Sequence, residues 1–278
     1  MQDKDETGDA LDTVRAARAQ SFGAIAADYD RYRPRPPQEA LRWLLPPGCR
    51  AALDLGAGTG ILTRGLAAMV PVVYAVDPDP RMRTVLSGSV PDAHVLSGRA
   101  EALPLADNSV DAVLVSAAWH WMDPDKAVPE IARVLRPDGV FGLLWNSPDR
   151  DVPWVAELFR TGPEGIETDE QLVQRRRLDA VRLPDGAPFG PPKTRVVPWV
   201  HHTTPEDLVG LVGTLSLVIR LPQPERETLL DRVAGFIDAR IQPTARGTIA
   251  LPMACRCWRA LRLAPGGTPH TPSTRRPG

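Results

Sequence analysis

A glycine-rich turn is the first feature whose residue types suit ligand chemistry. The sequence Gly56-Ala57-Gly58-Thr59-Gly60 directly follows the apolar run from Ala51 to Leu55 and precedes a helical pattern. Glycines let the backbone turn tightly and approach a ligand without an intervening Cβ, and the start of a helix offers unpaired N–H groups and a positive dipole end. The turn therefore predicts a ligand site, with a tight strand-to-helix connection that holds no ligand as the alternative.

An acidic residue follows this turn at the spacing used by nucleotide-binding folds. Asp77 ends the apolar run from Val72 to Val76, 21 residues after Gly56, and an acid at about this spacing accepts hydrogen bonds from ribose hydroxyls. Dinucleotide binders seat a pyrophosphate with G-x-G-x-x-G, whereas the third glycine here comes one residue early and Asp54 adds a carboxylate in the strand. A carboxylate opposes a pyrophosphate and suits a cation, so we expect an adenosine-type nucleoside.

The third candidate is a histidine between two tryptophans, Trp119-His120-Trp121, after the apolar run from Ala112 to Val115. Open α/β folds bind ligands at the carboxyl ends of their strands, and histidine is a suitable general base near neutral pH. We take His120 as the candidate catalytic residue, with a place in the pocket wall as the alternative. The tryptophans would line an apolar pocket or fill the core, and core is expected for Trp145.

The composition excludes several classes of protein. The chain has 278 residues, 43% hydrophobic and 24% charged, which is ordinary for a globular protein with a sizeable core. A net charge of −1 gives no electrostatic footprint for nucleic acid or anionic lipid, and no apolar run is long enough to span a membrane. Three cysteines are too few for a disulfide framework or a four-ligand zinc site, and we interpret Cys255 and Cys257 as strand residues. We expect a cytoplasmic protein with no metal site and neither a nucleic-acid nor a membrane partner.

Short apolar runs alternate with helical patterns, which predicts a doubly wound α/β fold with a mostly parallel sheet covered on both faces. The expected strands are Ala51 to Leu55, Val72 to Val76, His94 to Leu96, Ala112 to Val115, Val140 to Trp145, Thr194 to His202 and Thr248 to Trp258. The expected helices are Ile61 to Ala68, Pro80 to Leu86, Asp125 to Leu135 capped by Asp125, one capped by Thr204, and Pro224 to Ile241. We expect one domain at 19–262, with halves at 45–146 and 147–262, between flexible ends at 1–18 and 263–278.

The glycine turn and the acid together resemble the class I S-adenosylmethionine-dependent methyltransferases. The first motif of that family is similar to Asp54 to Gly60, and its second-strand acid is similar to Asp77. Three later segments, Gly98 to Leu105, Asp107 to Asp111 and Val134 to Gly139, extend the resemblance over about residues 20–146. The resemblance implies a seven-stranded Rossmann-like methyltransferase fold and S-adenosylmethionine as the cofactor.

The resemblance also implies which residues bind the cofactor. Met82 would pack on the adenine face, and the small residue Ala100 would meet the adenine edge. The family's usual acid in that loop aligns with Arg99, so either Glu101 takes its place or the backbone alone reads the adenine edge. The full expected set is Tyr29, Arg33, Asp54, Gly56, Ala57, Gly58, Thr59, Gly60, Asp77, Pro78, Met82, Ala100, Glu101 and Ala117.

The amino end narrows the resemblance to a small-molecule subgroup. Phe22 to Pro34 is similar to the trans-aconitate and malonyl-carrier-protein methyltransferases, in which this helix and the following arginine lie over the cofactor. This implies an N-terminal helical lid with Tyr29 and Arg33, against an amphipathic surface helix as the alternative. The implied acceptor is a small molecule, free or carrier-tethered, methylated on a carboxylate or hydroxyl oxygen. An alcohol or phenol would use His120 as a base, whereas a carboxylate needs none.

Two other functions stay open at this stage. One is a nicotinamide-dependent oxidoreductase, against which the short glycine spacing and Asp54 count. The other is a protein that binds S-adenosylmethionine but has lost methyl transfer, an alternative that the departure at Arg99 permits. The sequence names neither the acceptor nor the oligomeric state.

Overall fold

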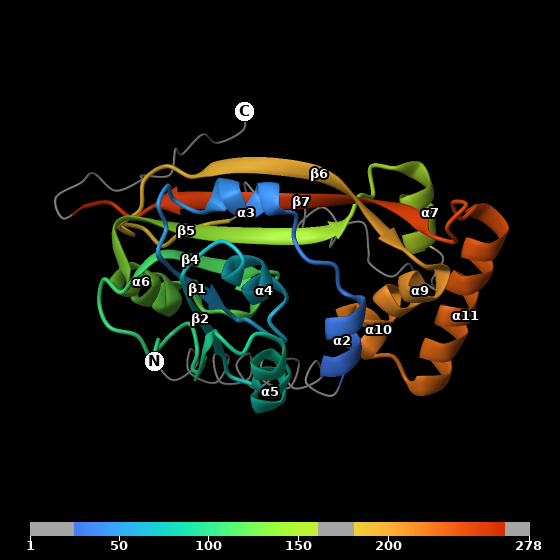
Figure 1. Ribbon diagram of the computed structural model, residues 1–278, viewed down its shortest axis with the longest axis horizontal. Coiled ribbons are helices and arrows are strands. Elements are labelled where there is room, and N and C mark those ends of the chain that lie inside the picture. The colour runs from blue at the N-terminus through green and yellow to red at the C-terminus, as the bar shows by residue number, and fades with distance from the viewer. Residues whose placement is uncertain (1–24, 161–180, 265–278) are drawn as a thin grey trace, which may run out of the picture.

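The computed structural model describes residues 25–160 and 181–264, in which one seven-stranded sheet carries helices on both faces (Figure 1). The strand order is β3-β2-β1-β4-β5-β7-β6, parallel from β3 to β5, with β7 antiparallel to both of its neighbours. The strands are β1 Ala51–Leu55, β2 Val72–Asp77, β3 His94–Ser97, β4 Val110–Ser116, β5 Leu135–Pro148, β6 Lys193–Thr203 and β7 Ile249–Leu261. The predicted doubly wound, mostly parallel sheet is confirmed, whereas the ends predicted to be flexible lie outside the described residues except for 263 and 264.

The helices form two sets. The first surrounds β1 to β4, and the second gathers at one end of the molecule, where α9, α10 and α11 lie beyond those strands (Figure 1). The helices are α2 Ala26–Tyr32, α3 Gln38–Leu44, α4 Ile61–Ala67, α5 Pro80–Ser89, the 3-10 helix η1 Trp119–Trp121, α6 Pro124–Val134, α7 Pro153–Arg160, α9 Pro205–Gly213, α10 Ser216–Ile219 and α11 Gln223–Arg240. None of the helices in the described ranges is long and apolar enough to cross a membrane.

Neighbouring residues of β1 serve opposite faces of the sheet, as the two-residue period of a strand requires. Leu53 packs in one core cluster with Ile131 of α6, whereas Ala52 packs in another with Leu41 of α3 and Leu62 of α4. All five side chains are almost completely buried. The central strands are therefore continuous apolar runs in the sequence. Packing on both faces fixes the edge of the sheet at which their carboxyl ends lie.

A third core belongs to the second set of helices. Phe159 of α7, Leu208 of α9 and Val233 of α11 pack with Leu251 and Met253 at the start of β7. The long strands β5, β6 and β7 run from this core into the α/β core, so the two parts share one sheet (Figure 1). The helix α7 falls in the region where the sequence pattern weakens, and it was not among the expected helices.

Two expected boundaries around α6 were wrong. The helix is capped by Asp123, whose carboxylate accepts the N–H of Asp125 at 3.1 Å, because Pro124 occupies the first helical position and needs no partner for its nitrogen. The chain is already extended at Leu135, which pairs with Val110, so β5 starts five residues before the expected Val140. The predicted cap of α9 by Thr204 is confirmed.

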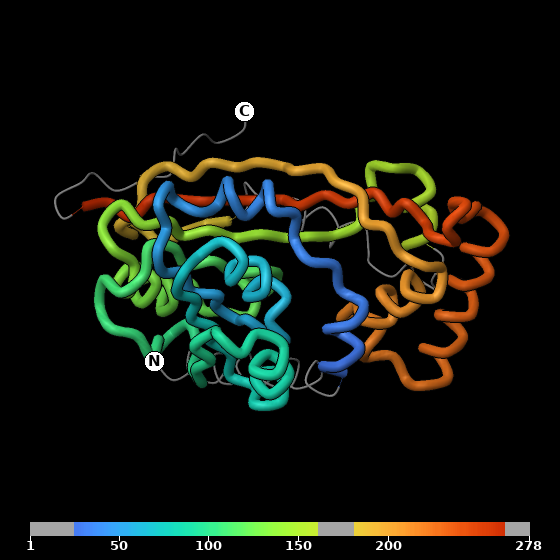
Figure 2. The backbone as a smooth tube through the Cα atoms, in the orientation of Figure 1, coloured from blue at the N-terminus to red at the C-terminus, as the bar shows by residue number. Residues whose placement is uncertain are grey.

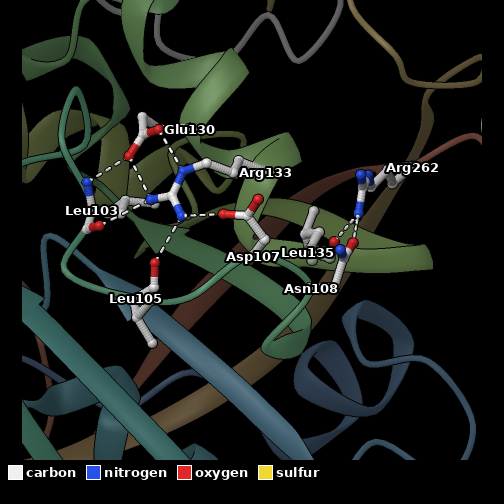
Figure 3. Close-up of polar contacts among 8 residues, drawn as sticks. All are labelled: Leu103, Leu105, Asp107, Asn108, Glu130, Arg133, Leu135 and Arg262. Atoms are coloured by element: carbon white, nitrogen blue, oxygen red, sulfur yellow. Dashed lines mark hydrogen bonds and ion pairs between the residues drawn. The ribbon is translucent and has the colours of Figure 1, made fainter.

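An arginine of α6 holds the loop that follows β3. The Arg133 guanidinium donates to both carboxylate oxygens of Glu130 and to the carbonyls of Leu103 and Leu105, and it also bonds Asp107 (Figure 3). Glu130 in turn accepts the N–H of Leu103 at 2.8 Å. Both polar groups of the Leu103 backbone are thus satisfied by one ion pair, which ties the loop to the helix.

We expect Arg133→Met to lower the free energy of unfolding by about 2–3 kcal/mol, because the carboxylate and two carbonyls lose their donor. Hydrogen bonding to Arg133 lowers the pKa of Glu130, so this carboxylate adds stability above an unfolded pKa of about 4.3, and the stability is lost as the pH falls through the native value. The variant should therefore lose less stability on acidification.

Urea unfolding at pH 3 to 7 measures both effects. Lys126→Met, at an exposed ion pair, is the control and should cost no more than about 0.5 kcal/mol; equal losses in the two variants would contradict the account.

Candidate functional site

A cavity of about 240 Å³ lies at the carboxyl edge of the sheet, where β1, β2, β4 and β5 meet the loop after β3. Segments distant in sequence build it, including the chain between α2 and α3, which passes between the two sets of helices (Figure 2). Twelve of the fourteen residues expected to bind a nucleoside cofactor line this cavity: Tyr29, Arg33, Gly56, Ala57, Gly58, Thr59, Asp77, Pro78, Met82, Ala100, Glu101 and Ala117. The structure therefore brings them together, and their binding roles stay predictions.

The glycine turn has the backbone conformation that glycine favours. Gly56, Gly58 and Gly60 have φ angles of +71°, +56° and +88°. A Cβ on Gly56 would come within 2.9 Å of the Cβ of Ala118, so this position has no room for a side chain. A Cβ on Gly58 would meet nothing within 4 Å. The first glycine is required for packing, and the second presents bare backbone to the cavity.

Asp77 is bonded to the turn that it faces. One carboxylate oxygen accepts the N–H of Gly58 at 2.8 Å, and the other accepts the N–H of Asp79 at 2.9 Å. The side chain is almost buried, and burial raises its pKa, although the two backbone hydrogen bonds act in the opposite direction. Each oxygen keeps a further lone pair, so the carboxylate can accept hydroxyl groups from a ligand in the cavity.

Asp54 and Gly60 are the two expected residues that do not line the cavity. Asp54 is fully buried beneath the turn, where one oxygen accepts the Thr63 hydroxyl at 2.6 Å and the other has no partner among the described residues. Gly60 begins α4, and a Cβ there would come within 2.9 Å of Leu86. Asp54 therefore supports the turn from beneath through Thr63, while Gly60 serves packing.

The loop after β3 supplies an ion pair at the position where the expected acid was absent. Arg99 and Glu101 both line the cavity, with Arg99 Nε 3.6 Å from a Glu101 oxygen. The other Glu101 oxygen accepts the N–H of Asp123 at 3.0 Å, which fixes the carboxylate against the start of α6. Met82 of α5 is buried at the cavity wall.

The amino-terminal segment is attached to both parts of the molecule. Arg33 donates from Nε to the Thr214 hydroxyl and from Nη2 to the Thr214 carbonyl, both at 2.9 Å, and its guanidinium lies 5.2 Å from the Tyr29 ring centroid. Asp30 pairs with Arg64 of α4. Tyr29 and Arg33 therefore reach the cavity from a helix anchored on two sides, while their role as a lid stays a prediction.

The tryptophan-histidine-tryptophan segment forms η1 beside the cavity. Trp119 is buried and packs edge-on against Phe141, whereas Trp121 lines the cavity. His120 is exposed and absent from the lining, with its ring 4.4 Å from that of Trp121. Trp145 is partly buried against the core, as expected. The catalytic role of His120 stays a prediction.

One expected lining residue has an unusual backbone, and three further lining residues were not among those expected from the sequence. Ala117 has a φ of +52°, a strained conformation for a residue with a Cβ, at the turn that leads into η1. Met122, Asn146 and Pro36 also line the cavity. Only the place of Asn146 at the carboxyl end of a strand offered a signal, because such ends bind ligands in open α/β folds.

The chain is similar in sequence to known methyltransferases. A family described as "Methyltransferase domain" matches residues 53–143, which include the glycine turn and Asp77. An uncharacterized methyltransferase of Mycobacterium tuberculosis is 45% identical over 240 residues, which cover 86% of this chain and 95% of that protein. The chain belongs to the methyltransferase family.

Other methyltransferases are similar over less of the chain or at lower identity. The malonyl-[acyl-carrier protein] O-methyltransferase of Methylococcus capsulatus is 42% identical over 193 residues, covering 60% of this chain and 70% of that protein. A solved structure of a candidate type II methyltransferase from Anaeromyxobacter dehalogenans has a TM-score of 0.53 at 27% identity, covering 83% of this chain and 97% of that one. Sequence relatives and a solved structure thus both indicate the methyltransferase fold.

The buried carboxyl of this methyltransferase makes stability depend on pH. Burial raises the pKa of Asp54 to about 7, above an unfolded value of about 3.9. Its contribution to stability is complete below about pH 4 and is lost as the pH rises to about 7. We expect Asp54→Asn to flatten the decline in the free energy of unfolding over this range, measured by urea unfolding at each pH.

Thr63→Val provides the matched variant. The Thr63 hydroxyl stabilises the carboxylate form, so its removal should extend the decline above pH 7. Identical pH profiles for the wild type and Asp54→Asn would contradict the assignment.

Proposed function

We propose that this methyltransferase uses S-adenosylmethionine and methylates an oxygen of a small-molecule acceptor, a carboxylate or hydroxyl group that is free or carrier-tethered. The observation that carries the proposal is the Asp77 carboxylate, held against the glycine turn by the N–H of Gly58 and lining the cavity. It has the position and lone pairs to accept both ribose hydroxyls.

The residues of the cavity fit a nucleoside with a cationic sulfonium. The side of Gly58 on which a Cβ would stand is open, so its backbone can lie against the ligand. Met82 offers an apolar contact for an adenine face, and the Arg99–Glu101 ion pair lies in the loop where the family reads the adenine edge. The Asp77 carboxylate adds a negative charge to the cavity, which suits a cationic ligand.

When bound, S-adenosylmethionine supplies an electrophilic methyl group on sulfur. The protein's own task is to orient an acceptor oxygen toward that group and to exclude water, because the departing thioether requires no acid. Ala118, Met122 and Pro36 give the wall beyond the turn an apolar character, and Arg33 gives it a cation. This combination favours an acceptor with an apolar body and an anionic group.

The carrier-tethered form of the proposal is supported by the malonyl-[acyl-carrier protein] O-methyltransferase relative. Isothermal titration with S-adenosylmethionine, S-adenosylhomocysteine and NAD tests the donor, and binding of NAD alone would overturn it in favour of an oxidoreductase. Incubation with carboxylic acids, phenols and malonyl thioesters, read as a mass gain of one methyl group in place of hydrogen, tests the acceptor. Donor binding without transfer to any candidate would favour a binding protein.

We expect Asp77→Ala to weaken the binding of S-adenosylhomocysteine by about 1–3 kcal/mol, or roughly 5- to 150-fold, through the loss of charge-assisted hydrogen bonds to the ribose. Calorimetry at 25 °C measures the dissociation constant, with thermal unfolding as a check that the variant is folded. Asp92→Ala, at an exposed turn before β3, is the control and should bind normally. An unchanged dissociation constant for Asp77→Ala would refute the ribose role.

His120→Ala tests the candidate base. A carboxylate acceptor is already ionised, and His120 lies outside the cavity lining, so we expect kcat to stay within a few-fold of the wild type. Loss of a general base typically lowers kcat by about 10²- to 10⁴-fold. A decrease of that size, with normal donor binding, would show that His120 acts as a base on a hydroxyl acceptor.

A further inference from the structure

Asn146 connects three segments at the side of the cavity away from Asp77. It lies near the carboxyl end of β5 and lines the cavity. Its amide nitrogen donates to the Pro34 carbonyl at 3.0 Å, and its amide oxygen accepts the Trp199 indole N–H at 2.9 Å. One side chain thus joins β5, β6 and the segment between α2 and α3.

These two contacts determine the orientation of the amide. The indole N–H of Trp199 can only donate, so the atom beside it must be the Asn146 oxygen. The carbonyl of Pro34 can only accept, so the atom beside it must be the Asn146 nitrogen. The two ends of the amide are therefore fixed independently. Exchange of the amide oxygen and nitrogen by a 180° rotation would break both hydrogen bonds.

The amide nitrogen carries two hydrogens, and Pro34 uses one. No hydrogen bond from the second is found within residues 25–160 and 181–264. A donor with spare capacity that faces a cavity loses hydrogen bonding unless water or a ligand accepts from it. The site therefore favours an oxygen at this point.

The position of Asn146 separates it from the nucleoside half of the cavity. Asp77 ends β2, and β5 lies three strands away in the order β2-β1-β4-β5. At about 4.8 Å per strand, the two side chains start about 14 Å apart along the edge of the sheet. The side chains of Ser116 and Trp121, which line the cavity on this side, are uncharged like Asn146.

We propose that Asn146 is an acceptor-binding residue whose free amide N–H donates to an oxygen of the methyl acceptor, and that Trp199 is the positioning residue that keeps this N–H in place. The inference rests on the proposed function and deepens it, because it selects acceptors that present a carbonyl or carboxylate oxygen beside the reacting atom. An amine acceptor offers no such oxygen and would be favoured by a carboxylate at this position instead.

The test compares acceptor kinetics with donor binding in the full chain. The oxygen probes are trans-aconitate and S-malonyl-N-acetylcysteamine. The comparison probes are 4-nitrophenol and phenethylamine, which present no carbonyl or carboxylate oxygen beside the reacting atom and should show no increase in KM in Asn146→Ala. For the oxygen probe with the highest turnover, Asn146→Ala should raise KM about tenfold, the loss of one hydrogen bond. The dissociation constant of S-adenosylhomocysteine should stay within about twofold, since the nucleoside lies at the other end of the cavity.

Two further variants separate acceptor binding from support of the fold. Asn146→Asp places an oxygen where the N–H was, so it should raise KM for oxygen probes more than Asn146→Ala does. Trp199→Phe removes the donor to the amide oxygen and leaves the amide held by the Pro34 contact alone, so it should raise KM for the same probe by about two- to fivefold. Trp43→Phe is its matched control, because Trp43 makes a cation–π contact with Arg259 at 4.5 Å and lies outside the cavity lining, and it should leave KM unchanged.

Several outcomes would overturn the inference. An unchanged KM in Asn146→Ala would do so, as would parallel increases in KM and in the dissociation constant of S-adenosylhomocysteine, which would indicate a structural role only. Binding of S-adenosylhomocysteine without binding or turnover of any oxygen probe would overturn the role of Asn146 and leave the donor site intact. Failure of the wild type to bind S-adenosylhomocysteine would instead overturn the proposed function itself.

Discussion

The site depends on one carboxylate that accepts two backbone N–H groups. Asp77 closes β2, and its bonds to Gly58 and Asp79 hold the bend after β1 against the bend after β2. Burial opposes the charge on this carboxylate, and the two N–H donors compensate for part of that cost. The backbone N–H groups of Gly56 and Ala57 also donate to the Val76 carbonyl, so the turn forms one wall of the cavity with a defined shape. The side of Gly58 on which a Cβ would stand is open within this wall.

The opposite wall is made by contacts that are distant in sequence. The helix α2 is joined to α4 through Asp30 and Arg64 and to the end of α9 through Arg33 and Thr214. Tyr32 packs directly over Gly210, where a Cβ would come within 2.6 Å of the ring. Asn146 completes this wall by bonding the segment that follows α2. The second set of helices thus supports this wall of the cavity through Thr214 and Gly210 without lining it.

This division explains how much was predictable. The glycine turn, Asp77 and Met82 lie within about one βαβ unit, where spacing along the chain determines proximity in space, and all of them except Gly60 line the cavity as the sequence indicated. Asn146, Met122 and Pro36 reach it through tertiary contacts that leave no periodic signal. Asp54 was expected beside the ligand because it adjoins the turn, but the two-residue period of the strand turns it beneath the bend. The early start of β5 was missed because Pro137, Asp138 and Gly139 are typical of a turn. The helix α7 was missed because prolines before it and at its start interrupt the helical pattern.

The shared strands limit how the molecule can move. Phe141 pairs with Ala260 in the α/β core, and Pro148 pairs with Met253 beside the helical core, so one continuous ladder passes through both. A hinge between the α/β core and the helical core would have to break hydrogen bonds between β5, β6 and β7. The two cores are therefore expected to move as one rigid unit. Within residues 25–160 and 181–264, helix α2 has no such strand pairing, and the bonds that tie it and Arg33 to α4 and to the end of α9 are made by the side chains of Asp30, Arg64 and Arg33. A shift of α2 would therefore break side-chain contacts only, whereas separation of the two cores would break the sheet itself.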